Sequence, residues 1–153
     1  LGKLDAGEAD VTFLAAAGLE RLGQSAVGQP LETGEWIPAA SQGVIAIECR
    51  ADAPEVTAML GAIDHAPTRA ELEAERALLA ALGGTCHSPV AVLCEADGDA
   101  LAMRAALFSP DGSERVEGKA NFARADHGPV AALAEDLLKR ASPAITEHFR
   151  QNA

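Results

Sequence analysis

Residues 88–123 carry strand-like segments separated by strong turn signals, and this pattern constrains the fold more than any other feature. Asp97-Gly98 is a dipeptide typical of tight β-hairpins. Pro110-Asp111-Gly112 offers a second turn, because Pro fixes one backbone angle and Gly accepts a positive φ. Consecutive strands joined by short turns pair antiparallel. The sequence therefore predicts a three-stranded antiparallel meander with strands at 88–95, 100–107 and 115–123.

Helical patterning surrounds the predicted sheet, in the segments 53–63, 67–82 and 129–141. In the second segment apolar side chains recur at spacings of three and four residues, and the glycine pair that follows ends the pattern. The order helix, helix, three strands, helix predicts a compact α+β unit with its helices on one face of the sheet.

The predicted helix at 67–82 is rich in glutamate. Thr68 and Glu71 have the spacing of a capping box, a pair of side chains that bind free backbone N–H groups in the first turn. Glu71, Glu73 and Glu75 are interpreted as a solvated helix face, since carboxylates are rarely buried. On this interpretation the three glutamates belong to no functional site.

The first fifty residues have a different character. Two apolar segments, 10–17 and 44–50, are typical of strands buried on both faces, and a loop rich in Gly, Pro and Ser lies between them. Such strands need neighbouring strands and helices that this chain does not supply. The chain also starts at Leu1 without an initiator Met. We therefore expect residues 1–50 to be part of a larger α/β body and the chain to begin within a longer protein.

Charge and cysteine content exclude several classes of function. The net charge of -11 argues against nucleic acid and anionic membrane as partners, since both bind basic surfaces. The sequence contains no run of about eighteen apolar residues, so no transmembrane helix is predicted. Three widely spaced cysteines fit neither a disulfide framework nor a zinc site, and the four histidines share no metal spacing. We expect reduced thiols, no bound metal and a cytoplasmic location.

Cys86 lies in a loop of small residues between the second predicted helix and the first predicted strand. On position alone the favoured interpretation is a buried thiol that fills space, since free cysteines are often buried. The alternative is a nucleophile or an attachment point. The preceding helix C-terminus disfavours a thiolate, which suits a bond formed once better than repeated turnover. Cys49 and Cys94 lie in strand-like segments and are interpreted as core residues.

Ser41-Gln42-Gly43 precedes the apolar segment at 44–50. A glutamine followed by glycine can present amide donors and an accessible backbone N–H to a ligand. Taken alone, this tripeptide is interpreted as an ordinary loop.

An ordered set of short motifs resembles one protein family. The motifs are Leu4-Asp5-Ala6-Gly7-Glu8-Ala9-Asp10, Leu14-Ala15-Ala16-Ala17-Gly18-Leu19-Glu20-Arg21-Leu22-Gly23, Pro38-Ala39-Ala40-Ser41-Gln42-Gly43, Ile47-Glu48-Cys49-Arg50, Glu75-Arg76, Gly84-Thr85-Cys86 and Pro110-Asp111-Gly112-Ser113. In this order and spacing the chain resembles the C-terminal half of the porphobilinogen deaminase (hydroxymethylbilane synthase) family along essentially its whole length. It departs from the family at Ser41, where Gly is common, and at Thr85, where many members have Gly directly before the Cys.

The resemblance implies a transferase of tetrapyrrole (haem and chlorophyll) biosynthesis, which joins four porphobilinogen units into hydroxymethylbilane and releases ammonia. It implies a dipyrromethane cofactor linked to the loop Cys by a thioether. The family's catalytic Asp and its cationic residues are expected upstream of this chain, so no catalytic residue is assigned here. The residues that the resemblance assigns to the cofactor are Cys86 (covalent), Gln42, Gly43, Leu14 and Ala15.

The resemblance also implies three parts and a set of partners. Residues 1–38 are expected to be the latter part of a second α/β domain of the periplasmic-binding-protein type. Residues 39–58 would return through the absent first domain, and residues 59–153 would form the cofactor-anchoring α+β domain. The expected partners are porphobilinogen, the growing pyrrole chain and the missing N-terminal domain, within a monomeric enzyme. Alone, the chain is expected to be inactive, and a non-catalytic α+β ligand-binding or interaction module is the alternative.

Overall fold

The computed structural model describes residues 1–149 of the chain. It divides into two units, the first spanning Leu1–Glu35 and the second beginning at Trp36, and each is described by itself. The first unit contains two short helices, α1 (Gly2–Asp5) and α2 (Ala16–Arg21). Neither helix has a buried residue, so this unit has no hydrophobic core of its own.

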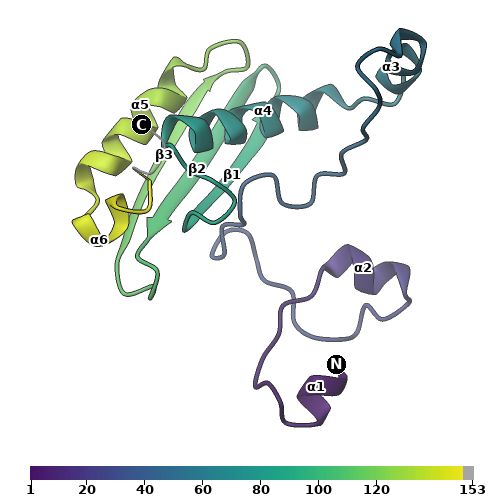
Figure 1. The fold of residues 1–153 in the computed structure, drawn as a ribbon, viewed down its shortest axis with the longest axis vertical. Helices are drawn as coiled ribbons and strands as arrows, with labels where there is room; N and C mark the ends of the chain where they lie inside the picture. The colour runs from purple at the N-terminus through teal and green to yellow at the C-terminus, as the bar shows by residue number, and fades with distance from the viewer. Residues whose placement is uncertain (150–153) are drawn as a thin grey trace. The chain divides into compact units, whose positions relative to one another are not determined.

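The second unit contains a three-stranded sheet and four helices. The strands pair antiparallel in the order β1-β2-β3, as the turn signals predict. Figure 1 shows α4 and α5 covering the same face of the sheet, which confirms the predicted α+β fold for this unit. The elements are α3 (Pro54–Gly61), α4 (Ala66–Ala81), β1 (Val90–Asp97), β2 (Ala100–Phe108), β3 (Arg115–Ala123), α5 (Gly128–Arg140) and α6 (Pro143–Thr146).

One core lies between the sheet and the two long helices. Alternate residues of β2 point into it, because successive side chains of a strand face opposite sides. The core side chains are mostly small or aliphatic, so the helices approach the sheet closely. A Cβ added at Gly118 of β3 would lie only 2.6 Å from Cδ1 of Leu133. The largest fully buried side chains are Leu78, Leu82, Val92, Leu101, Met103, Leu107, Val130, Leu137 and Ile145.

The two strands predicted in the first fifty residues are absent, and this part of the prediction is wrong for the chain as described. Residues 10–15 and 44–50 have no regular secondary structure, and α2 begins at Ala16. Phe13 is 73% exposed and Ile45 is 86% exposed. A strand is stabilised by hydrogen bonds to a neighbouring strand. Within residues 1–149 the only strands are those of the meander, so these two segments have none to pair with. In the same described range, no helix has both the length and the apolar character needed to cross a membrane.

Asp111 fastens the turn between β2 and β3. Its Oδ1 accepts hydrogen bonds from Ser109 Oγ at 2.6 Å and from the Ser113 backbone N–H at 3.1 Å. Gly112 supplies a φ of 72°, which L-residues adopt only with strain. Hydrogen bonds from Ser109 and Ser113 to the carboxylate lower the pKa of Asp111 to about 2.

We expect thermal stability to fall as the pH is lowered from about 4 to about 2, in part through Asp111. The pKa of an ordinary Asp is 3.8, so the stabilisation is fully present above that pH and is lost as the pH falls through the lower folded value. Thermal melts of the wild type and of Asp111→Asn across this range test the idea. Between these two pH values the Tm of the variant should decrease less than the Tm of the wild type, since the amide of Asn does not titrate. Equal losses would contradict the assignment.

Candidate functional site

The Cys86 loop, residues 83–88, connects α4 to β1. Gly83 has a φ of 66°, a left-handed conformation that ends α4. The Gly84 N–H then donates to the carbonyl of Leu79 at 2.9 Å and closes the last turn. A Cβ added at Gly83 would lie 2.6 Å from the carbonyl oxygen of Phe149. The chain beyond α6 therefore contacts the loop backbone directly, at a position where only glycine fits.

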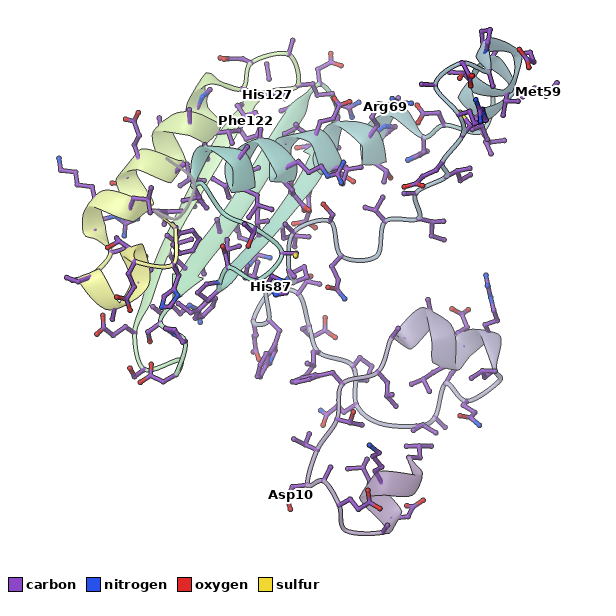
Figure 2. All side chains as sticks on the ribbon, in the orientation of Figure 1. Asp10, Met59, Arg69, His87, Phe122 and His127 are labelled. Carbon is purple, nitrogen blue, oxygen red and sulfur yellow. The ribbon has the colours of Figure 1, made fainter. Side chains whose placement is uncertain are left out.

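Hydroxyl groups hold the loop in shape. Ser88 Oγ accepts from the Thr85 N–H at 2.9 Å and donates to the carbonyl of His148 at 3.4 Å. Thr85 Oγ1 accepts from the N–H of His87 at 3.2 Å, and the Ser88 N–H donates to the carbonyl of Thr85 at 3.0 Å. His87 marks this loop in Figure 2. The residues on either side of Cys86 are thus fastened while its own side chain is exposed.

The three cysteines lie in different surroundings. Cys94 in β1 is buried, and desolvation raises its pKa to about 12, so its thiol stays protonated. Cys86 is exposed, and the interpretation of it as a buried space-filling thiol is wrong. Cys49 is also exposed, contrary to its predicted place in a core, because the strand expected around it does not form. Its Sγ lies 3.5 Å from Thr57 Oγ1.

Gln42 and Gly43 lie in a turn that is fastened to the edge of β1. The turn has two left-handed residues, Ser41 with a φ of 64° and Gly43 with a φ of 82°. Just before it, the carbonyl of Pro38 accepts from the N–H of Val92 at 2.8 Å. Gln42 and Gly43 are themselves exposed. The turn and the Cys86 loop therefore belong to the same unit, and both are joined to β1.

Glu75 makes the second attachment of this turn, and the interpretation of it as a solvated residue is wrong. It is 7% exposed in the middle of α4. Its Oε2 accepts from the N–H of Ser41 at 2.7 Å and its Oε1 from the N–H of Cys94 at 3.0 Å. Burial raises the pKa of this carboxyl group, while the two backbone N–H groups oppose that rise.

The predicted capping box at the start of α4 is also wrong. The N-cap residue is His65, whose Nδ1 accepts from the N–H of Thr68 at 3.4 Å. Glu71 instead accepts from the N–H of Ala96 in β1 at 2.8 Å. A signal for both glutamates was present in the sequence: residues 71, 75, 78 and 82 share one helix face at spacings of three and four, and that face carries two core leucines.

Leu14 and Ala15 belong to the first unit. Leu14 is 48% exposed, and Ala15 is the exposed N-cap residue of α2. The two units are described separately, so the structure does not bring these residues to Cys86. Their predicted place beside Gln42 and Gly43 stays a prediction. Among residues 1–149, no three His, Cys, Asp or Glu side chains form a group that could hold a metal ion.

Two family models match this chain. "Porphobilinogen deaminase, dipyromethane cofactor binding domain" matches residues 1–58, and "Porphobilinogen deaminase, C-terminal domain" matches residues 69–139. The porphobilinogen deaminase of Sphingopyxis alaskensis is 53% identical over 150 residues, which cover 97% of this chain and 47% of that protein. The chain belongs to the porphobilinogen deaminase family. The resemblance seen in the ordered motifs is confirmed, and the family is one of transferases with a dipyrromethane cofactor.

Other porphobilinogen deaminases give the same result. The protein of Nitrobacter hamburgensis is 45% identical and that of Nitrobacter winogradskyi 44% identical, each over 143 residues that cover 92% of this chain and 45% of the relative. The chain thus spans about half the length of the curated relatives it matches. The division into 1–38, 39–58 and 59–153 stays a prediction.

Proposed function

We propose that this chain is the part of a porphobilinogen deaminase that anchors the dipyrromethane cofactor, through a thioether to Cys86. The observation that carries the proposal is an exposed thiol in a loop whose neighbouring residues are all fastened. The loop lies within the match to the family's C-terminal domain. A fixed loop holds a covalent group in one place, whereas an exposed Sγ leaves room for it.

The chemistry that Cys86 would perform needs no oxidant. Porphobilinogen carries an aminomethyl group on its pyrrole ring, and loss of the amine leaves an electrophilic methylene carbon. The sulfur forms a C–S bond with this carbon, and the thiol proton leaves with the amine as ammonia. A second porphobilinogen would lose its amine in the same way, and its methylene carbon would bond to the free ring carbon of the first pyrrole, whose proton leaves with the amine as ammonia. The dipyrromethane completed in this way would supply the primer to which further pyrrole units are added. Since the sulfur is never released again, its position after a helix C-terminus does not impair turnover.

Gln42 and Gly43 would hold the cofactor without forming bonds to it. The Gln42 side chain provides amide donors, and Gly43 leaves its backbone N–H accessible to carboxylate side chains of the pyrroles. Leu14 and Ala15 would add apolar contacts. The net charge of -11 supports the view that the cationic groups for these carboxylates come from another part of the enzyme, and the resemblance to the family places the catalytic Asp there as well. On this proposal the chain alone is inactive, and the complete enzyme is a cytoplasmic monomer.

A chimera tests the proposal. This chain would replace the aligned part of the Sphingopyxis alaskensis protein, and the purified chimera would be supplied with porphobilinogen. We expect hydroxymethylbilane to form and the intact mass to increase by two pyrrole units, with the added mass mapped to the Cys86 peptide. The 153-residue chain alone should form no product. A folded chimera with neither adduct nor product would overturn the proposal and favour a non-catalytic module.

A further inference from the structure

The outer edge of β1 is closed by groups from outside the sheet. β1 pairs with β2 along one edge only, so the N–H groups of alternate residues point away from the sheet along the other. Three of these N–H groups find acceptors, one in the backbone before the Ser41 turn and two in glutamate side chains of α4. Val92 donates to the carbonyl of Pro38, Cys94 to Glu75 Oε1 and Ala96 to Glu71 Oε1.

Glu75 differs from the other two acceptors because it binds a second backbone group. Glu71 and the Pro38 carbonyl each accept one of the hydrogen bonds described above, whereas both oxygens of Glu75 are used. Its second partner, the N–H of Ser41, opens the turn that contains Gln42 and Gly43. A single buried carboxylate therefore joins this turn to α4 and β1, the two elements that carry the Cys86 loop at their ends.

Ser41 has a left-handed backbone conformation at this contact. Among residues 1–149 it is the one residue other than glycine with a positive φ. A left-handed serine is disfavoured unless its surroundings stabilise it. The hydrogen bond of 2.7 Å to a buried carboxylate is of the charge-assisted type, which is stronger than one between neutral groups. The turn is thus held in a shape that its own residues do not favour.

We infer that Glu75 is a positioning residue for the dipyrromethane cofactor. It fixes Gln42 and Gly43 relative to the thioether at Cys86, so that the donors of the turn and the covalent anchor form one rigid cradle. This inference rests on the proposed function. It assigns no contact between Glu75 and the cofactor, since both carboxylate oxygens are occupied by backbone N–H groups.

The variants Glu75→Gln and Glu71→Gln separate positioning from general stability. A glutamine at position 75 has one acceptor oxygen and one NH₂ group, so one of the two N–H groups loses its acceptor and faces a donor. A glutamine at position 71 keeps the single acceptor that Ala96 needs. The two changes are chemically identical, lie one helical turn apart and remove the same charge.

Hydrogen exchange of the 153-residue chain gives the first measurement. In the wild type we expect the amides of Ser41 and Cys94 both to be protected. In Glu75→Gln, exchange across residues 39–44 should accelerate about tenfold, as expected for loss of a hydrogen bond to a charged group, while α5 keeps its protection. Glu71→Gln should leave residues 39–44 unchanged. A freely exchanging Ser41 amide in the wild type would overturn the inference, even if the variant fails to fold.

Turnover by the chimera gives the second measurement. The rate is expressed per molecule that carries the Cys86 adduct, so loss of folded protein does not affect it. For Glu75→Gln we expect kcat to fall about tenfold while KM for porphobilinogen changes less than about twofold, and for Glu71→Gln both should stay within about twofold. A wild-type chimera without adduct would refute the proposed function and the inference together. A functional wild type with an equally functional Glu75→Gln would refute the positioning role alone.

Discussion

Replacing Cys86 with serine should abolish covalent attachment of the pyrrole cofactor and lower turnover by the chimera a thousandfold or more, on the order of the loss seen when other enzymes lose a covalent nucleophile. A serine hydroxyl is a much weaker nucleophile than a thiol without a base beside it. The hydrogen bonds described for the loop involve Thr85, His87 and Ser88, so the substitution should leave the fold intact. Intact mass and the rate of hydroxymethylbilane formation measure the two effects.

Cys49→Ser is the matched control for this experiment. Cys49 is the other exposed cysteine, and the substitution replaces the same sulfur atom by oxygen. The variant should keep the adduct and change turnover less than about twofold, since it exchanges a single atom outside the Cys86 loop. Retention of the adduct in Cys86→Ser, or its loss in Cys49→Ser, would show that the anchor has been assigned to the wrong residue.

Gly83→Ala should lower the free energy of unfolding by about 2–5 kcal/mol, since a left-handed backbone costs about 1–2 kcal/mol for an L-residue and overpacking about 1–3 kcal/mol. The new Cβ would lie 2.6 Å from the backbone oxygen of Phe149, where no flexible side chain can move aside. Either the Phe149 backbone or the Cys86 loop must shift. Denaturation in urea measures the loss.

Gly98→Ala measures the backbone part of this effect alone, so the difference between the two variants gives the steric part. Gly98 has a φ of 57°, and nothing lies within 4 Å of a Cβ added there. This variant should show only the backbone cost of about 1–2 kcal/mol. If both alanine variants lost the same stability, the contact between Gly83 and Phe149 would not matter. In the chimera, Gly83→Ala should also slow attachment of the pyrroles to Cys86, whereas Gly98→Ala should not.

Local signals were enough to predict the sheet. β3 spans the predicted residues, and the bounds of β1 and β2 differ from the prediction by at most two residues, because Asp97-Gly98 and the turn at 110–112 fix where strands end. The three helices predicted around the sheet also formed, with bounds that differ from the prediction by at most two residues. Glycine and proline near the helix ends were the local signals for these bounds. The strands expected at 10–17 and 44–50 failed because a strand depends on partners distant in sequence, and pattern alone does not supply them.

The anchor residue was predicted only through resemblance. Position favoured a buried Cys86, because nothing in the sequence near it reveals the hydroxyl network that fastens the loop and leaves the thiol outside. Glu75 was missed because carboxylates are usually solvated. Its place on the helix face that carries Leu78 and Leu82 was a local signal for burial. The two backbone donors that satisfy it lie 34 residues before it and 19 residues after it, and no local pattern reveals them.

The fastening of the Cys86 loop has a consequence for the timing of biosynthesis. The carbonyl of His148, which accepts from Ser88, lies sixty residues downstream of it. A ribosome adds about 5–20 residues per second, so the loop leaves the exit tunnel several seconds before the segment that holds it. Throughout that interval the loop that carries the Cys86 thiol lacks the hydrogen bond from Ser88 to His148. Attachment of a group that requires the finished loop would therefore be a late event, after the segment around His148 has been made.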